Sequence, residues 1–463
     1  MLQRLGQSLA VGLRHWIPDP FVFALGLTLI IGLLAVTFTD SPPVAVLGHW
    51  YEGFWALLGF GMQMVLILTT GYAIALSPAA RNVIDRLGRS VDRPAHVYFL
   101  VTLVGGMLVL VSWGWVVLTA VFAREMALRV RGLDYAYLTA CVYVSSQIWV
   151  GGLSSSIPLL MNTDGNFLIE TGVLDAPLGI DRTLGSSLNL VFAGVYLLLI
   201  PGLMVLLRPR RTDATPIEDM LHADKAAEIP VEKEAAAMSL AEGTPAERLN
   251  RSAILQAMVA LAGLGYVVVH FVERGFSLDL NIMIFIFLMV GMLAHRTPMR
   301  FVVAMRRACA NVSGIIFQYP FYAGIMGIMS FSGLATIVSD WIISHASVNT
   351  LPALAQFAGA AVNFAIPSAG GEWAVIGPSM TEAAKSLAAL EGIDPDGLVA
   401  RVAMAVAYGE TSTNLLQPFY LLIILPVMGA GVRLYARDVV GYLVLPFIVT
   451  YLITALMVSL VPL

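Results

Sequence analysis

The chain has 463 residues, of which 58 % are hydrophobic and only 12 % are charged, and its formal net charge is −4. Water-soluble globular proteins carry about 25 % charged residues, so this composition excludes that class. The small acidic excess gives no sign of nucleic-acid binding. Apolar runs recur along the whole chain, and about 20 such residues suffice for one membrane-spanning helix. A transmembrane β-barrel would need short alternating segments, which are absent. We therefore expect an all-α polytopic membrane protein.

Nine segments are predicted to be membrane spans. They are 20–38, 58–77, 136–161, 183–207, 253–271, 281–294, 311–331, 401–432 and 438–462. Lys and Arg concentrate in cytoplasmic loops. The arginine-rich loops 78–95, 124–135 and 295–310 are therefore placed inside, and the acid-rich loop 162–182 is placed outside. This assignment predicts a cytoplasmic N-terminus.

Two further apolar stretches begin and end on the same predicted side. The stretch 96–123 lies between two cytoplasmic loops and has Ser112-Trp113-Gly114 near its middle. The stretch 351–390 lies between two external loops and is centred on Pro367-Ser368-Ala369-Gly370-Gly371. Apolar segments interrupted by Gly or Pro mark binding sites in transporters, so each is predicted to be a re-entrant hairpin of two half-length helices. Two ordinary spans in place of each hairpin are the alternative, and they would leave the other spans on the same predicted sides.

A polar segment, 208–250, divides the chain almost in half. It is predicted to be a cytoplasmic linker, with a short surface helix as one option. The chain is thus expected to consist of a first membrane repeat, 1–207, the linker, and a second membrane repeat, 251–463.

Three short matches in the same order link the halves. They pair Gln63 with Gln318, Ser112 with Asn363, and Tyr143 with Tyr408. The two hairpins open to opposite sides, so the repeat is predicted to be inverted. An inverted repeat places the substrate near the bilayer midplane and lets one bundle move against the other.

The hairpin tips are the first candidate site. A helix that begins within the membrane presents N–H groups and the positive end of its dipole, which suits a substrate carboxylate. Glycines would let the backbone approach the ligand closely. The alternative is that these small residues only pack helices together. With one residue from the second broken span, the predicted substrate-binding residues are Ser112, Trp113, Gly114, Asn363, Ser368, Gly370, Gly371 and Asn414.

Two polar clusters, 147–158 and 410–418, lie inside apolar runs, and each contains or ends at a proline that frees a backbone carbonyl. Their hydroxyl, amide and carbonyl oxygens could coordinate Na⁺, and a carboxylate at membrane depth could carry H⁺. The alternative is that the hydroxyls bond their own helices, that Glu372 is hydrated in a vestibule and that Glu410 pairs with an arginine. Arg124 and Glu125 are predicted to form a surface pair. The predicted ion-coupling residues are Ser154, Ser155, Glu372, Glu410, Thr411, Thr413 and Gln417.

No catalytic set is evident, and the protein is not expected to be an enzyme. Cys141 and Cys309 both lie in or beside apolar segments, so neither a disulfide nor a metal site is indicated. A possible coupling ion, Na⁺ or H⁺, is the only cofactor expected.

Long motifs follow one another along nearly the whole chain. They are Trp16-Ile17-Pro18-Asp19-Pro20, Gly53 to Met64, Phe122-Ala123-Arg124-Glu125, Asn363 to Gly371, and Ala407-Tyr408-Gly409-Glu410 with Gln417-Pro418-Phe419. This set resembles the bacterial short-chain fatty acid transporters of the acetoacetate and butyrate uptake type, a branch of the ion transporter superfamily. The chain departs from the familiar members at Ser112, Glu372 and Thr411, where they have Asn, His and Gln.

The resemblance implies a homodimer with an elevator mechanism, in which a scaffold holds the dimer while a transport domain with both hairpins slides. It implies secondary active transport of short-chain fatty acids or related small monocarboxylates, coupled to H⁺ or Na⁺, across the bacterial cytoplasmic (inner) membrane. A carrier or exporter of a different carboxylate is the alternative, and a channel is a weaker one. The expected partners are a small carboxylate, the lipid bilayer and a second copy of the chain.

Overall fold

The computed structural model describes residues 20–87, 93–209, 214–220, 231–238, 244–275, 278–310, 312–363, 366, 368–417, 421–429 and 432–461. Helices make up the regular elements of this part of the chain. The first half contains α2 (Pro20–Phe38), α3 (Pro43–Ala56), α4 (Leu58–Ala75), α5 (Pro78–Leu87), α6 (Pro94–Val111), η2 (Trp113–Trp115), α7 (Val116–Arg129), α8 (Tyr135–Ser146), η3 (Gln147–Gly151), α9 (Ile157–Met161), α10 (Phe167–Glu170), η4 (Ile180–Arg182) and α11 (Ser187–Leu206).

The second half follows three short elements of the predicted linker, η5 (Ile217–Met220), α12 (Val231–Ala237) and α13 (Pro245–Asn250). It contains α14 (Ala253–Arg274), α15 (Leu280–His295), α16 (Pro298–Ala310), α17 (Ser313–Phe331), α18 (Leu334–His345), α19 (Leu351–Asn363), α20 (Ala369–Glu391), α21 (Pro395–Asn414), α22 (Leu421–Met428), α23 (Ala436–Val440) and α24 (Val444–Leu460).

Four stretches of the described chain are long and apolar enough to cross a membrane. They are the α3–α4 stretch Pro43–Ala75, α6, α11 and α14, and the pair α17–α18, bent by 75°, makes a fifth if it is one span. This number is below the nine spans predicted. Two of those, 136–161 and 401–432, are helices broken near their middle, and other apolar helices are shorter than 18 residues.

Each predicted hairpin consists of two helices, one before and one after a break. α6 and α7 pack against each other around η2, and α19 packs against α20. The expectation of half-length arms was wrong for two of the four helices. α6 has 18 residues and could span a membrane by itself, and α20 has 23 residues. The side of the membrane on which each hairpin opens stays a prediction.

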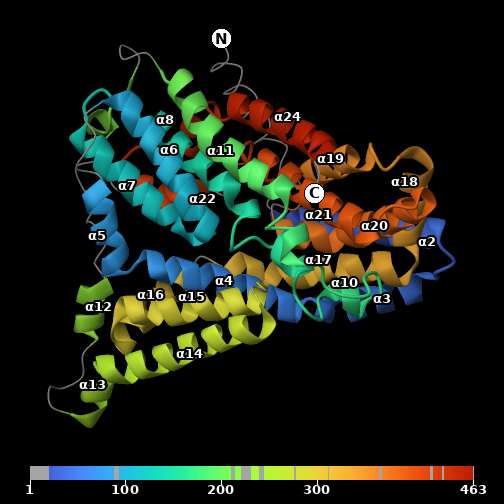
Figure 1. Ribbon diagram of the computed structural model, residues 1–463, viewed down its shortest axis with the longest axis horizontal. Coiled ribbons are helices and arrows are strands. Elements are labelled where there is room, and N and C mark those ends of the chain that lie inside the picture. Colours follow the sequence, from blue (N-terminus) through green and yellow to red (C-terminus); the bar gives the residue numbers. More distant parts are fainter. Residues whose placement is uncertain are drawn as a thin grey trace.

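The helices form two layers (Figure 1). The lower layer, defined as α2–α4 and α14–α17, is held by packing of α17 on α2 and α3, of α15 on α4, and of α14 on α15. The upper layer, defined as α6–α8, α11, α19–α22 and α24, is held by packing of α6 on α8 and α11, and of α21 on α19, α20 and α24. Both hairpins belong to the upper layer.

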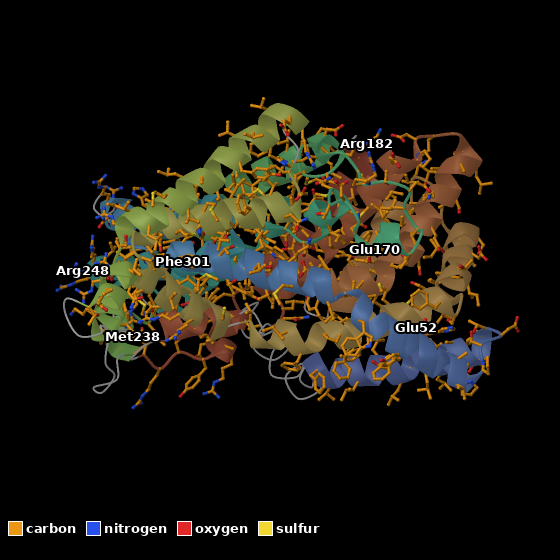
Figure 2. The ribbon with its side chains drawn as sticks, turned by 90° about the horizontal axis from the view of Figure 1, so that it is seen from below. Glu52, Glu170, Arg182, Met238, Arg248 and Phe301 are labelled. Carbon is orange, nitrogen blue, oxygen red and sulfur yellow. The ribbon has the colours of Figure 1, made fainter. Side chains whose placement is uncertain are left out.

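The residues predicted to lie on opposite sides of the membrane are well separated. Figure 2 shows Met238 and Arg248, from the predicted cytoplasmic linker, at one end of the long axis. Glu170 and Arg182, from the predicted external loop, lie toward the other end. A membrane-spanning arrangement requires such a separation. Which end faces the cytoplasm stays a prediction.

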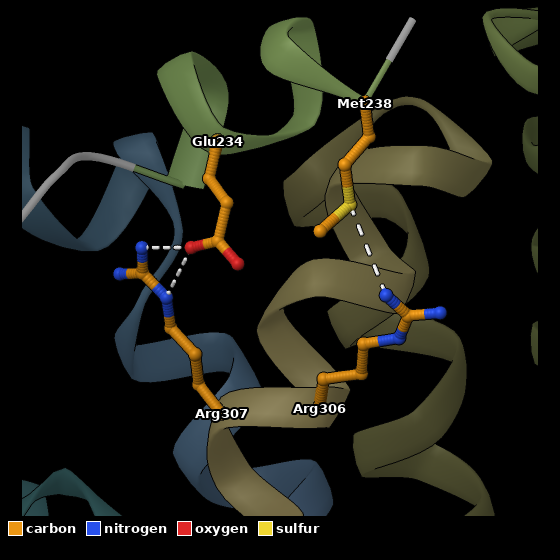
Figure 3. Close-up of polar contacts among 4 residues, drawn as sticks. All are labelled: Glu234, Met238, Arg306 and Arg307. Atoms are coloured by element: carbon orange, nitrogen blue, oxygen red, sulfur yellow. Dashed lines mark hydrogen bonds and ion pairs between the residues drawn. The ribbon is translucent and has the colours of Figure 1, made fainter.

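One part of the linker is docked on the lower layer. Val231 and Ala235 of α12 are buried in a small apolar cluster with residues of α4 and α16. Glu234 of α12 accepts hydrogen bonds from Arg307 of α16 (Nε to Oε2, 2.9 Å), and Met238 Sδ lies 3.8 Å from Arg306 Nη1 (Figure 3). The described α12 is thus a surface helix that packs on α4 and α16.

α3 and α17 cross through two glycines. A Cβ atom at Gly53 would lie 2.5 Å from the Cα of Gly327, and one at Gly327 would be as close to Gly53. Small residues at a crossing let two backbones approach and gain dispersion contact inside a membrane. This crossing fixes the α3–α4 stretch against α17, which carries two tyrosines of the candidate site.

Gly53→Val is expected to lower the thermal unfolding midpoint of the purified protein by several degrees. The added methyl groups would force α3 from α17, and overpacking typically costs about 1–3 kcal/mol. Gly48→Val is the matched control, because Gly48 lies on the same helix and a Cβ there meets no atom within 4 Å. Equal midpoints for the two variants would contradict the proposed importance of the crossing.

Candidate functional site

A buried cluster of amides forms where the second hairpin meets the break after α21. The side-chain nitrogen of Asn363 lies 3.0 Å from Glu410 O, 2.8 Å from Thr413 Oγ1 and 2.9 Å from Asn414 Oδ1. Gln417 donates its side-chain N–H to Asn363 O. All five residues, Asn363, Glu410, Thr413, Asn414 and Gln417, are at most 5 % exposed. We call them the amide cluster.

Close helix packing brings this cluster together. The backbone of α19 passes so near Gly409 that a Cβ there would collide with Gln356 O. Only glycine permits that approach, which places Asn363 at the end of α19 over the last turn of α21. Four of the five members of the amide cluster were predicted from their position beside Pro418. Pro418, like Pro367 at the hairpin tip, lies outside the described residues.

The first half supplies partners to the same break. Tyr143 of α8 donates its hydroxyl to Asn414 O at 2.6 Å and lies 3.0 Å from Gln417 O. Thr411 of α21 donates to Gln147 O, and its hydroxyl lies 3.3 Å from Gln147 Oε1. The broken spans of the two halves therefore meet directly. Thr411 contacts the first half rather than the amide cluster.

A smaller polar group forms at the first hairpin tip. Ser112 ends α6 with extended backbone, and the N–H of Trp113 donates to Ser154 Oγ at 2.7 Å. Ser112, Ser154 and Ser155 are at most 2 % exposed, and the hydroxyl oxygens of Ser112 and Ser155 have no hydrogen-bond partner. Buried polar groups are normally paired, so an unpaired hydroxyl at each of these two adjoining breaks is consistent with a place for a ligand or ion.

Each hairpin tip rests on a helix of the lower layer. At the first tip, a Cβ atom at Gly114 would lie 2.7 Å from Tyr72 N of α4. Trp115 donates its indole N–H to Gly71 O at 3.1 Å. The tip thus lies directly on the backbone of α4, so Gly114 serves close helix packing in this structure.

At the second tip, the partners are tyrosines of α17. The hydroxyls of Ser368 and Tyr319 are 3.1 Å apart, and Ser368 caps α20 by accepting from Gly371 N at 3.5 Å. A Cβ atom at Gly370 would lie 2.6 Å from Tyr319 Oη, and one at Gly371 would lie 2.6 Å from the Tyr322 ring. Aromatic side chains therefore occupy the space that these glycines leave open.

Two carboxylates are fully buried in the upper layer. Glu410 accepts from Asn414 Nδ2 at 2.7 Å through Oε1, while its Oε2 has no hydrogen-bond partner. Asn414, and no arginine of the described chain, is thus the hydrogen-bond partner of Glu410. Neither oxygen of Glu372 has a partner, and Glu372 lies against Gly359 of α19, without a hydrogen bond to the amide cluster. An ionised carboxylate in such a setting is costly unless a proton or a cation neutralises it.

Arg124 has a different role from the predicted surface pair. Its guanidinium donates to Val427 O at 3.0 Å and Met428 O at 3.2 Å, the last carbonyls of α22. Tyr135 donates its hydroxyl to Met428 O at 2.7 Å. A cation at the C-terminal end of a helix satisfies free carbonyls and the negative end of the dipole. Arg124 thus ties the first hairpin to the broken span of the second half.

Lys385 makes the reciprocal connection. It lies on α20, the second arm of the second hairpin, and donates to Val173 O at 3.1 Å and to Asp175 at 2.9 Å in the first half. The second arm of each hairpin therefore carries a cation that bonds a backbone carbonyl of the opposite half.

Sequence reasoning missed several partners. Tyr143 and Tyr319 contact the site, and Arg124 and Lys385 connect the two halves outside it, but none of the four belongs to the polar clusters singled out in the sequence. A tyrosine in an apolar run is one signal that could have indicated the first two, because a buried hydroxyl needs a hydrogen-bond partner.

Comparisons with known proteins decide the family. Residues 1–461 match the family described as short chain fatty acid transporter. The chain belongs to the short chain fatty acid transporter family. It is 35 % identical over 446 residues to an Escherichia coli K12 relative named for short-chain fatty acid transport, with 96 % of both chains covered. A Haemophilus influenzae relative with the same name is 35 % identical over 456 residues, covering 97 % of this chain and 98 % of that one.

Two solved structures share the fold of this short chain fatty acid transporter family member. The Alcanivorax borkumensis YdaH transporter has a TM-score of 0.57 at 16 % identity, covering 96 % of this chain and 98 % of that one. Neisseria gonorrhoeae MtrF, described among antimetabolite efflux pumps, has a TM-score of 0.56 at 16 % identity, covering 96 % and 95 %. Family membership and apolar helices identify a multi-pass membrane transporter, not an enzyme.

Arg124→Gln is expected to lower stability by about 1.5–3 kcal/mol, because the hydrogen bonds of a charged donor to two carbonyls of α22 are lost. Thermal unfolding of the purified transporter measures the change. Arg129→Gln is the control, since Arg129 pairs with Glu125 at 3.4 Å while more than 40 % exposed, and exposed pairs contribute about 0–1 kcal/mol. Equal losses in both variants would show that the α22 contacts are unimportant.

Proposed function

We propose that this protein is a secondary active transporter of short-chain fatty acids or related small monocarboxylates, such as acetoacetate and butyrate, across the bacterial cytoplasmic membrane. The observation that carries the proposal is the family match over residues 1–461. The buried polar clusters at the helix breaks support it, because a transporter needs polar groups inside an otherwise apolar bundle.

The substrate carboxylate would bind between the start of α20 and the amide cluster. Ser368 begins α20, whose first N–H groups and dipole favour an anion. Tyr319 and Ser368 would donate hydroxyl hydrogen bonds, since their oxygens are already 3.1 Å apart. The rings of Phe60 and Tyr322 beside Gly370 and Gly371 would contact the short apolar tail.

The coupling ion would act at the buried carboxylates. Glu410 accepts a hydrogen bond from Asn414, and Asn414 accepts one from Asn363. A proton or Na⁺ at Glu410 would therefore alter the groups around Asn363. Glu372 lies on the arm that begins at the second tip. Hydroxyls at the first tip, from Ser154 and Ser155, would contribute to a Na⁺ site if the ion is Na⁺.

Movement of the upper layer against the lower layer would provide alternating access. Each half contains a hairpin, then a broken span, then a long helix, in the same order. Ser112 and Asn363, matched between the halves in sequence, both end the first arm of a hairpin. These correspondences support a structural repeat. The inversion of that repeat is proposed from the charge distribution of the loops, and the elevator motion of the hairpin-bearing layer and the homodimer held by the lower layer are proposed from the family resemblance.

Export, or transport of a different carboxylate, is the second candidate. The fold shared with MtrF, described among efflux pumps, makes the direction of transport worth measuring. A channel is a weaker candidate, because flux through it would not saturate.

Uptake into proteoliposomes tests the proposal. We expect saturable entry of labelled butyrate or acetoacetate that accelerates with an inward H⁺ or Na⁺ gradient. Each gradient is imposed alone and then removed with an ionophore, and vesicles loaded with substrate test export. Absence of saturable flux of either acid in both directions would refute the substrate class.

Asn414→Ala is expected to reduce butyrate uptake at least about tenfold, because it leaves the buried partners of the amide cluster unsatisfied, each at about 1–3 kcal/mol. Ser368→Ala is expected to raise KM by removing a donor at the tip. Ser412→Ala is the matched control on α21, since the Ser412 hydroxyl donates to Tyr408 O of its own helix at 2.7 Å. Normal uptake by both Asn414→Ala and Ser368→Ala would refute the site.

Glu410→Gln and Glu372→Gln test coupling. We expect at least one of them to abolish gradient-driven accumulation while retaining butyrate exchange across the membrane, because exchange needs no net movement of the coupling ion. Glu125→Gln, at an exposed carboxylate, is the control. If both buried variants accumulate butyrate as the unsubstituted protein does, neither carboxylate couples transport.

A further inference from the structure

A cavity lies away from the helix breaks. It has a volume of about 320 Å³ and is lined by the start of α19, the start of α21 and the end of α24. Val348, Pro352 and Leu398 contribute apolar surface, and Asn349, Arg401 and Ser459 contribute polar groups. Pockets that bind small molecules typically measure about 300–1,000 Å³ and combine apolar walls with a few polar groups.

Arg401 is the group that gives this cavity a charge preference. It is half-buried and donates from Nη1 to Val458 O at 3.1 Å, in the last turn of α24. A guanidinium has five N–H donors in a fixed fork. In the described contacts, Nη1 is the Arg401 nitrogen that donates a hydrogen bond. Nε and Nη2 are not among the described polar atoms that are both buried and without a partner. The remaining donors are therefore accessible on a residue that lines the cavity.

The carboxylate that lines this cavity, Asp394, already has a cationic partner. It pairs with Arg182, and its Oδ1 accepts from Asp396 N at 3.2 Å. The Arg182 guanidinium lowers the pKa of Asp394 below its ordinary value, so this pair stays charged near neutral pH. Arg182 lies beside a loop at the upper edge of the molecule in Figure 2. Within the cavity, Arg401 is thus the cation without an acidic partner.

The cavity is separate from the amide cluster. Arg401 precedes Glu410 by nine residues on α21, which corresponds to about 14 Å along the axis and to the opposite face of the helix. One ligand the size of butyrate cannot bridge the two positions.

We propose that this cavity is a second binding site for a small monocarboxylate at the mouth of the transporter, with the carboxylate on Arg401 and Asn349 and the short tail on Pro352 and Leu398. Arginine and carboxylate match in geometry and form strong paired hydrogen bonds. The proposal takes its ligand class from the proposed function. A site of this kind would hold substrate at the protein surface before or after its passage through the helix breaks.

Protection of an introduced thiol tests the proposal. Ser459→Cys is made in a Cys309→Ser background, because Ser459 is an exposed residue that lines the cavity, while Cys309 is exposed and Cys141 is buried. The purified transporter is treated with the anionic reagent MTSES, with and without butyrate. We expect butyrate to slow labelling by at least about threefold through competition for Arg401, and Arg401→Gln to remove this protection. Arg401→Lys should retain part of it, whereas a purely structural role at Val458 would make Lys and Gln equivalent.

Asn414→Ala in the same background is the control for the central site and should leave protection unchanged. No protection with Arg401 intact, or equal protection in Arg401→Gln, would overturn the proposal. Should Arg401→Gln fail to fold, the preference for MTSES over cationic MTSET, normalised to their rates with a small thiol, is measured with Arg401 intact. A preference for MTSET, or no labelling, would also overturn it. Protection without flux would refute the proposed function alone, and flux without protection would refute this site alone.

Discussion

The structure depends on how helices that break inside an apolar bundle satisfy their free polar groups. At the end of α21, the carbonyls of Asn414 and Gln417 meet the hydroxyl of Tyr143. At the end of α22, the final carbonyl of Met428 meets Arg124 and Tyr135. Buried backbone groups are almost always paired, and in lipid no water replaces a missing partner. Because these donors come from the first half, the second half cannot keep its breaks buried without it.

This constraint separates two kinds of contact. Within the upper layer, hydrogen bonds and cation–carbonyl contacts cross from one half to the other, as Arg124 and Thr411 show. Between the layers, the tips are in contact mainly through glycines, backbone and aromatic rings, with the Ser368–Tyr319 hydroxyl pair and the hydrogen bond from Trp115 to Gly71 O as polar exceptions. Contacts of the second kind can be exchanged without leaving a charge unpaired. That difference supports motion of the upper layer as one body, which is the movement we propose.

The sequence predicted the breaks better than their partners. Ser112, Asn363 and the Glu410–Gln417 segment were found because polar residues, Gly and Pro interrupt apolar runs, which is a local signal. The residues 43–56 were not predicted as helix because His49, Glu52 and two glycines lower their apolar character. Arg124 was placed on the surface because its neighbour Glu125 suggested a local pair. Its true contact is about 300 residues away, and pattern reasoning within a window cannot find such a partner.

The chemistry of the two halves differs more than their architecture. The first tip carries serine hydroxyls, from Ser112 and Ser154, whereas the second hairpin and its broken span carry Glu372 and Glu410. Only a group that changes charge can respond to a proton, and a carboxylate with an unpaired oxygen is also the stronger ligand for a cation. In the proposed mechanism, a coupling proton would therefore act in the second half and influence the first through Tyr143 and Thr411, whose hydroxyls join the two breaks. Two halves with the same order of elements would then direct transport because their polar groups differ.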